Sequence, residues 1–80
     1  MSMKLFTADW CVNCKPIKRL IEDEHFPVDV IDVDKMPDFV RASGIRSIPC
    51  LLLGDGTWVL GTENIKKVIK EAYGSATNSN

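Results

Sequence analysis

Two cysteines separated by two residues, at the point where a strand pattern passes into a helix pattern, constrain the fold of this chain most strongly. Residues 3–7 have the composition of a short strand, and apolar residues then recur with helical spacing from Ile17 to Ile21. Cys11 and Cys14 lie on the turn between the two patterns. This arrangement predicts the first half of a β–α–β unit, with both cysteines at the start of its helix.

The position of Pro16 is compatible with two interpretations of where that helix starts. A proline is tolerated in the first helical turn, but deeper in a helix it removes a hydrogen bond and its ring clashes with the preceding turn. The helix therefore either begins near Asn13 or is bent at Pro16. Residues 25–27, His-Phe-Pro, predict its end.

The rest of the chain continues to alternate between the two patterns. Residues 28–33 are rich in β-branched side chains and predict a second strand, after which Asp34 can cap a short helix that stops at Gly44. Residues 48–53 form an apolar run typical of a strand buried on both faces. A Gly-Asp-Gly turn then predicts a hairpin with residues 57–60.

A last helix is predicted from residue 62 onwards. Its apolar stripe consists of Ile65, Val68, Ile69 and Ala72, and Gly74 is expected to cap it. The element order is therefore βαβαββα, an α/β fold with a central four-stranded mixed sheet flanked by helices. Residues 1–74 are expected to form one domain and residues 75–80 a disordered polar tail.

Composition and charge exclude several classes of protein. Ten Lys and Arg residues balance 11 Asp and Glu residues, so there is no dense basic cluster to bind nucleic acid. No apolar run approaches the roughly 20 residues of a membrane span, and the first residues do not resemble a secretion signal. An odd count of three cysteines suits a reducing compartment. We expect a cytoplasmic monomer that binds neither nucleic acid nor membrane.

The cysteine pair predicts thiol–disulfide chemistry. A free cysteine is only about 3% thiolate at pH 7, whereas unpaired amides and the dipole at a helix start lower the pKa of a thiol placed there. We expect Cys11 to be the attacking thiolate and Cys14, one turn later, to resolve the mixed disulfide. The alternative is a zinc site, but it needs four ligands, and only His25 and Cys50 remain to complete it. No metal ligands are therefore assigned.

Two segments carry a resemblance to the thioredoxin superfamily. Residues 8–15, Ala-Asp-Trp-Cys-Val-Asn-Cys-Lys, resemble the thioredoxin active-site segment. Residues 44–53 resemble the stretch of thioredoxins that carries a cis-proline. With the order of elements, the resemblance covers residues 3–73 and implies a thioredoxin-like fold in a minimal form, as in glutaredoxins and in the small redoxins of bacteria, archaea and phages.

The resemblance implies a substrate-binding surface around the cysteines. Pro49 would be cis and face the pair, and the backbone of Ile48 would pair with an extended substrate segment. Trp10, Val12 and Gly61 would complete an apolar rim suited to a protein partner. Cys50, next to Pro49, is expected to pack as a small apolar side chain, with a third reactive thiol as the alternative.

The sequence also departs from the thioredoxin pattern. Val12 and Asn13 replace the usual Gly-Pro between the cysteines. Leu5 occupies the position of the buried aspartate that takes a proton from the second cysteine in thioredoxins, so the Cys14 proton needs another acceptor, such as water or Lys15.

The resemblance implies a protein disulfide reductase whose only redox group is the Cys11–Cys14 pair, with no bound cofactor. Its expected partners are a thioredoxin-reductase-type flavoprotein and protein disulfides, ribonucleotide reductase among them. One alternative is a glutathione-dependent glutaredoxin, although the Cys-Pro-Tyr-Cys, Thr-Val-Pro and Gly-Gly motifs of that family match poorly here. A metal-binding module built on the two cysteines is the other.

Overall fold

The computed structural model describes residues 3–45 and 47–74 of the chain. Four strands form one sheet in the order β2-β1-β3-β4. β1 pairs in parallel with β2 and antiparallel with β3, and β3 pairs antiparallel with β4. The strands span Met3–Thr7 (β1), Val28–Asp32 (β2), Cys50–Leu52 (β3) and Trp58–Leu60 (β4).

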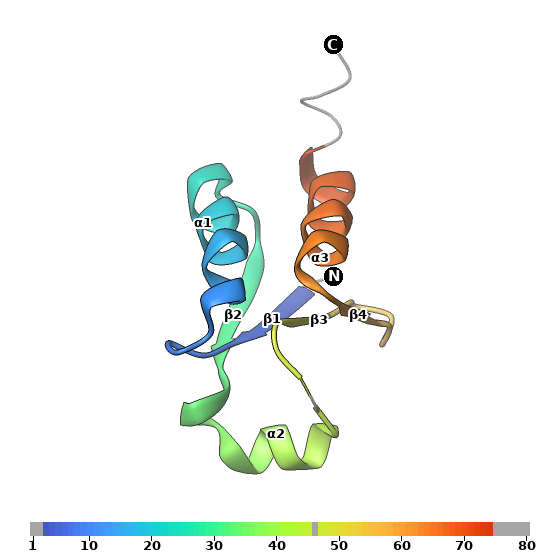
Figure 1. Ribbon diagram of the computed structural model, residues 1–80. Coiled ribbons are helices and arrows are strands. Elements are labelled where there is room, and N and C mark those ends of the chain that lie inside the picture. The colour runs from blue at the N-terminus through green and yellow to red at the C-terminus, as the bar shows by residue number, and fades with distance from the viewer. Residues whose placement is uncertain (1–2, 46, 75–80) are drawn as a thin grey trace.

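Three α-helices connect and follow the strands (Figure 1). They span Lys15–Glu24 (α1), Pro37–Ser43 (α2) and Thr62–Ile69 (α3). Short turns of 3-10 helix precede the first two, at Val12–Cys14 (η1) and Val33–Lys35 (η2), and a π-helical turn at Lys70–Gly74 (η3) extends the third. The predicted βαβαββα order and the α/β class with a mixed four-stranded sheet are confirmed.

The structure resolves the position of Pro16. The chain enters the helix through η1, and α1 begins at Lys15 with Pro16 in its first turn, where its missing N–H is not needed. At the other end His25 adopts the left-handed conformation with φ of 57°, and its N–H donates to the carbonyl of Glu22. The interpretation in which the helix starts close to Asn13 is therefore correct.

The main core lies between the sheet and the pair α1 and α3, which cover the same face (Figure 1). Leu5 and Leu51 from the two central strands are fully buried there, between Ile17 of α1 and Ile65 of α3. The prediction that Ala72 belongs to the apolar stripe of the last helix is wrong, because Ala72 is exposed. Tyr73 packs there instead and stacks on Phe26, with ring centroids 5.7 Å apart. The switch to a π-helical turn at Lys70–Gly74 accompanies this shift of the apolar stripe.

The opposite face of the sheet is covered by α2. Phe6 of β1 is fully buried between Phe39 of α2 and Trp58 of β4, with ring centroids 5.7 Å from each. Gly44 ends α2 with φ of 75°, as the sequence predicts. The chain thus forms three layers, with the turn that carries the cysteines at one end of the central strand β1.

Two predictions concern features beyond this core. The predicted tail, residues 75–80, lies outside the described residues. Within the part of the chain that the structure describes, no helix has the length and apolar character needed to cross a membrane.

Candidate active site

A disulfide bond joins Cys11 and Cys14 at the start of the η1–α1 helix. Their Cα atoms are 5.4 Å apart, within the usual range for bonded cysteines. Cys14 is fully buried, whereas Cys11 keeps 6% of its surface exposed. The outer sulfur of the pair therefore belongs to Cys11.

The backbone at the turn prepares Cys11 for negative charge. Cys11 has extended dihedral angles and occupies the N-cap position of η1, and its N–H donates to the carbonyl of Ala8 over 3.0 Å. A side chain at an N-cap can accept a hydrogen bond from an amide of the first turn; the N–H of Cys14 already donates to the carbonyl of Cys11 over 3.2 Å, which leaves the amide of Asn13. In the disulfide form the Cys11 side chain accepts no capping hydrogen bond. When the disulfide opens, a thiolate at Cys11 can gain from the Asn13 amide and from the helix dipole.

The surroundings of the pair are apolar. Ala8 is buried with the two cysteines, and Val33 and Ile48 pack against this cluster. Buried polar side chains among the described residues are limited to Thr7, whose hydroxyl lies 3.5 Å from the carbonyl of Ile31. The described part of the site therefore surrounds its sulfurs with apolar side chains and contains no buried carboxylate.

The residues around Cys14 limit the acceptors available to its proton. Leu5, at the position where thioredoxins carry an aspartate by resemblance, is fully buried in the main core. Lys15, directly after Cys14, is exposed. A proton leaving Cys14 has no buried carboxylate to accept it within the described residues.

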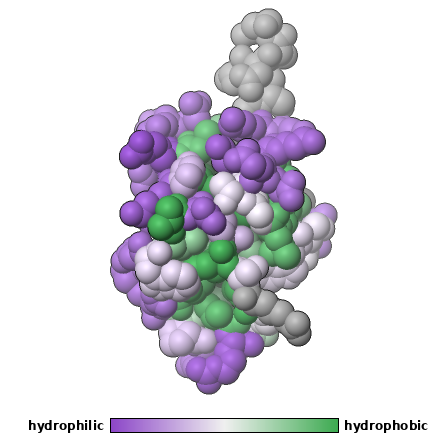
Figure 2. Space-filling model, viewed as in Figure 1, coloured by the Kyte–Doolittle hydropathy of each residue, from purple (hydrophilic) through white to green (hydrophobic). Residues whose placement is uncertain are grey.

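The residues predicted to form the rim differ in their exposure. Trp10 and Val12, on either side of Cys11 in the sequence, are 65% and 73% exposed. Ile48 is half-buried, Pro49 is buried and joined to Ile48 by a cis peptide bond, and Gly61 is exposed. Figure 2 shows hydrophobic surface across the middle of this face of the molecule, between more hydrophilic regions above and below it.

Trp10 is held by a residue to which the sequence assigned another role. Its indole Nε1–H donates to Oδ2 of Asp34 over 2.8 Å. The prediction that Asp34 caps the short helix ending at Gly44 is wrong, because the N-cap of α2 is Met36, with no side-chain hydrogen bond. The short turn before it, η2, is capped by Asp32, whose Oδ1 accepts from the N–H of Asp34 over 2.9 Å. No local pattern links Trp10 to a carboxylate 24 residues later.

A shallow hollow connects Trp10 with the segment before the cis-proline. Its volume is about 210 Å³, and it is lined by Trp10, Val33, Val40, Ile45, Ser47 and Ile48. Two of the predicted binding residues, Trp10 and Ile48, therefore share one concave surface beside the disulfide.

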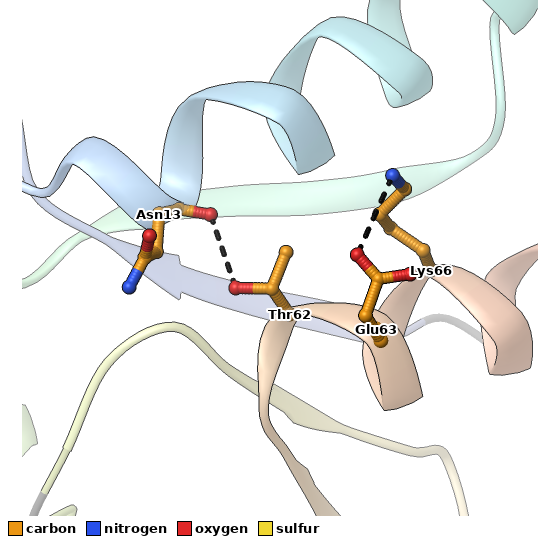
Figure 3. A network of polar contacts seen from close by, with 4 residues as sticks. All are labelled: Asn13, Thr62, Glu63 and Lys66. Carbon is orange, nitrogen blue, oxygen red and sulfur yellow. Dashed lines mark hydrogen bonds and ion pairs between the residues drawn. The ribbon is translucent and has the colours of Figure 1, made fainter.

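The start of α3 also contacts the cysteine turn (Figure 3). The hydroxyl of Thr62 donates to the carbonyl of Asn13 over 3.4 Å, and Glu63 and Lys66 form an ion pair one turn along. Gly61, with φ of 90°, is the N-cap residue directly before α3, and Thr62 after it reaches the turn. The sequence predicts Thr62 only as the opening of a helix, because the contact joins residues 49 apart.

Cys50 is the third thiol and is not bonded to the pair. It is 1% exposed on β3, and desolvation by burial raises the pKa of its thiol from 9.0 to about 11. Such a thiol is protonated at neutral pH and is a poor nucleophile. The prediction that Cys50 packs as a small apolar side chain agrees with this burial.

No group of three or more His, Cys, Asp or Glu side chains close enough to hold a metal ion occurs among residues 3–45 and 47–74. His25 ends α1, whereas the cysteines start it. The fold and the dithiol site together define a thiol–disulfide oxidoreductase.

Comparison with known proteins agrees with this class. Residues 3–59 match the model of the family described as glutaredoxin. The chain is 36% identical over 61 residues to the glutaredoxin-like protein NrdH of Salmonella typhimurium, and the alignment covers 72% of this chain and 75% of that protein. The protein of the same name from Escherichia coli K12 is 34% identical over the same shares. The chain therefore belongs to the glutaredoxin family.

Solved structures show the same fold. The glutaredoxin-like NrdH-redoxin of Escherichia coli, described as having a thioredoxin-like activity profile, aligns with a TM-score of 0.66 and 30% identity over 89% of this chain and 93% of that one. Thioredoxin 1 of Thermosipho africanus aligns over 98% of this chain and 99% of its own, with a TM-score of 0.65 and 22% identity. The predicted thioredoxin-like fold is confirmed.

Proposed function

We propose that this oxidoreductase is a dithiol electron donor, recharged by a thioredoxin-reductase-type flavoprotein, that supplies ribonucleotide reductase among other protein disulfides. The observation that carries the proposal is the Cys11–Cys14 disulfide at a helix start beside an exposed apolar rim. Exposed Trp10 and Val12 favour a protein surface as substrate, because large apolar side chains at a site edge suit protein contacts.

In the proposed cycle both cysteines of the pair have fixed roles. The Cys11 thiolate attacks one sulfur of a substrate disulfide, forming a mixed disulfide and releasing the first substrate thiolate. Cys14 then loses its proton to solvent and attacks the Cys11 sulfur. This step forms the Cys11–Cys14 disulfide and releases the second substrate thiolate. Two electrons pass to the substrate, and the reductase returns two electrons to the pair.

The rim residues are proposed to bind the substrate. Trp10 and Ile48 share the hollow beside the disulfide, and the backbone of Ile48 is proposed to pair with an extended substrate segment. In the proposal Pro49 contacts the end of that segment, and Val12 and Gly61 add to the contact surface. No cofactor besides the disulfide is part of the proposal.

Insulin reduction coupled to thioredoxin reductase and NADPH tests the proposal. Wild type and the matched Cys50→Ala control, which removes a thiol outside the pair, should be active, while Cys11→Ser should fall to background. Cys14→Ser should accumulate a mixed disulfide with its substrate, visible by mass spectrometry. Activity of Cys11→Ser equal to that of wild type would contradict the assignment. Reduction of oxidised ribonucleotide reductase in the same coupled system tests the specific partner.

A glutathione-dependent activity is the second candidate, and the match to the glutaredoxin family model favours it. Two parallel assays with one protein sample separate the candidates. One supplies electrons through thioredoxin reductase and the other through glutathione and glutathione reductase. Faster turnover in the glutathione system would replace the proposed electron source.

A further inference from the structure

On the α1 side of the cysteine turn lies a second concave surface that does not include the rim residues Trp10 and Ile48. It is an open hollow of about 420 Å³ lined by Val12, Lys15, Pro16 and Arg19. Val12 directly follows Cys11, so this basic hollow begins beside the outer sulfur. From there it extends along α1 through Lys15 and Arg19, which lie four residues apart on one helix face.

The two cations of the basic hollow are available to a partner. Lys15 and Arg19 are both exposed. The ion pairs found among the described residues join Arg41 to Asp38 and Lys66 to Glu63, so neither Lys15 nor Arg19 is paired there. A carboxylate that approaches this hollow meets two cations that have no competing partner within the described structure.

The opposite side of the turn carries the reverse charge. Asp34 accepts the hydrogen bond from Trp10, and Asp32 accepts from the N–H of Asp34. In the sequence Asp9 directly precedes Trp10, and Lys35, directly after Asp34, is the neighbouring cation. In Figure 1 the turn after β1 lies between α1 and the segment that leads into α2. The disulfide is thus flanked by a basic surface on one side and a mainly acidic one on the other.

We propose that the basic hollow at Val12, Lys15 and Arg19 binds an acidic polypeptide segment that flanks the target disulfide, and so selects the protein substrate and its orientation. This inference rests on the proposed function. Val12 offers apolar contact next to the attacking sulfur, while Lys15 and Arg19 bind carboxylates one and two helical turns further along. Arg19 can bind a carboxylate with two parallel hydrogen bonds. The acidic side of the turn repels the same segment, so it lies on one side only.

Two synthetic peptides provide the test. Each contains one internal disulfide, and the flanking residues are Glu and Asp in one and Gln and Asn in the other. Pre-reduced protein is mixed with each peptide in a single-turnover reaction, which needs no reductase, and the rates are followed by acid quenching and chromatography. At low ionic strength we expect wild type to reduce the acidic peptide about tenfold faster. At about 1 M salt the ratio should approach one.

The variant Lys15→Gln with Arg19→Gln should lower that rate ratio to about two or less. Both peptides react with the same thiol, so any effect of Lys15 on Cys14 or Cys11 cancels in the ratio. The matched control, Lys67→Gln with Lys70→Gln, makes the same change of charge at exposed positions on α3 and η3 and should keep the tenfold ratio.

Each contrary outcome has a distinct meaning. Equal reduction of both peptides by wild type refutes the basic hollow as a docking surface and leaves the proposed function intact. Reduction of neither peptide refutes both. An equal loss of preference in the Lys67 and Lys70 control shows a net-charge effect and overturns the inference. The Lys15→Gln, Arg19→Gln variant could lose as much activity with oxidised glutathione as with the acidic peptide. That result would assign the hollow to glutathione and overturn the choice of a polypeptide.

Discussion

Alkylation of Cys50 offers a quantitative test of how tightly the sheet encloses this thiol. In the oxidised protein Cys50 is the free cysteine, and burial raises the pKa of its thiol from 9.0 to about 11. Iodoacetamide reacts with the thiolate. At pH 8 a thiol of pKa 9.0 is about 9% ionised and one of pKa 11 about 0.1%. The native protein should therefore be alkylated about 100-fold more slowly than the same protein unfolded in guanidinium chloride.

The pH dependence of the rate is the sharper observation. Below pH 9 Cys50 is protonated in both states, and between pH 9 and 11 only the unfolded state loses the proton. The contribution of the neutral thiol to stability is therefore complete below pH 9 and is lost as the pH rises toward 11. Unfolding becomes easier over the range in which the unfolded thiol is already ionised. The alkylation rate should thus rise tenfold per pH unit to at least pH 10. This holds whether the reagent enters the native state or a transiently opened one.

The assay is a time course of mass spectra on oxidised protein from pH 7 to 10, with circular dichroism to verify that the protein stays folded. Unfolded protein is the control, and its rate should begin to level off at pH 9, where half of the thiol is ionised. The same levelling at pH 9 in the folded protein would refute the argument, because it would mean that the native thiol is as easily ionised as a free one. Cys50→Ala should take up no label while the Cys11–Cys14 disulfide is intact.

Three further predictions concern side chains around the site. Leu5→Ala should lower the free energy of unfolding by about 2–5 kcal/mol in urea titrations, because Leu5 is fully buried; a loss below about 1 kcal/mol would contradict that packing. Thr62→Val should cost up to about 1 kcal/mol through the lost bond to the Asn13 carbonyl, whereas Thr62→Ser should retain most of it, and equal stabilities would show that the bond contributes nothing. Asp34→Ala should raise the mobility of the Trp10 indole, measured by fluorescence anisotropy, and Asp34→Asn, which keeps an acceptor oxygen, should stay close to wild type.

The order of elements was predictable from local patterns. Alternating apolar residues, the proline-led apolar run and the glycines at 44, 54 and 56 each act through the backbone of their own segment. Two strands were predicted to be longer than they are, since residue 33 belongs to η2 and residues 48, 49 and 53 lie outside β3. Pairing partners set the ends of a strand, and these partners are distant in the sequence.

The candidate site was predictable where a residue acts through its immediate neighbours. Cys11 and Cys14 could be identified from their spacing and from their position on the turn between a strand and a helix. Asp34 and Thr62 were not recognised, because each acts on the site through one hydrogen bond to a residue 24 or 49 positions away. Such contacts depend on how the elements pack, and a single sequence carries no local signal for them.

The position of β1 at the centre of the sheet bears on the order in which the molecule can be made. The turn with the cysteines directly follows β1, whose second neighbour, β3, lies far along the chain. During synthesis on a ribosome, the β3 edge of β1 therefore stays unpaired until the segment that contains β3 has emerged. The redox centre at the end of β1 acquires its complete support only after the two intervening helices and β2 have been made.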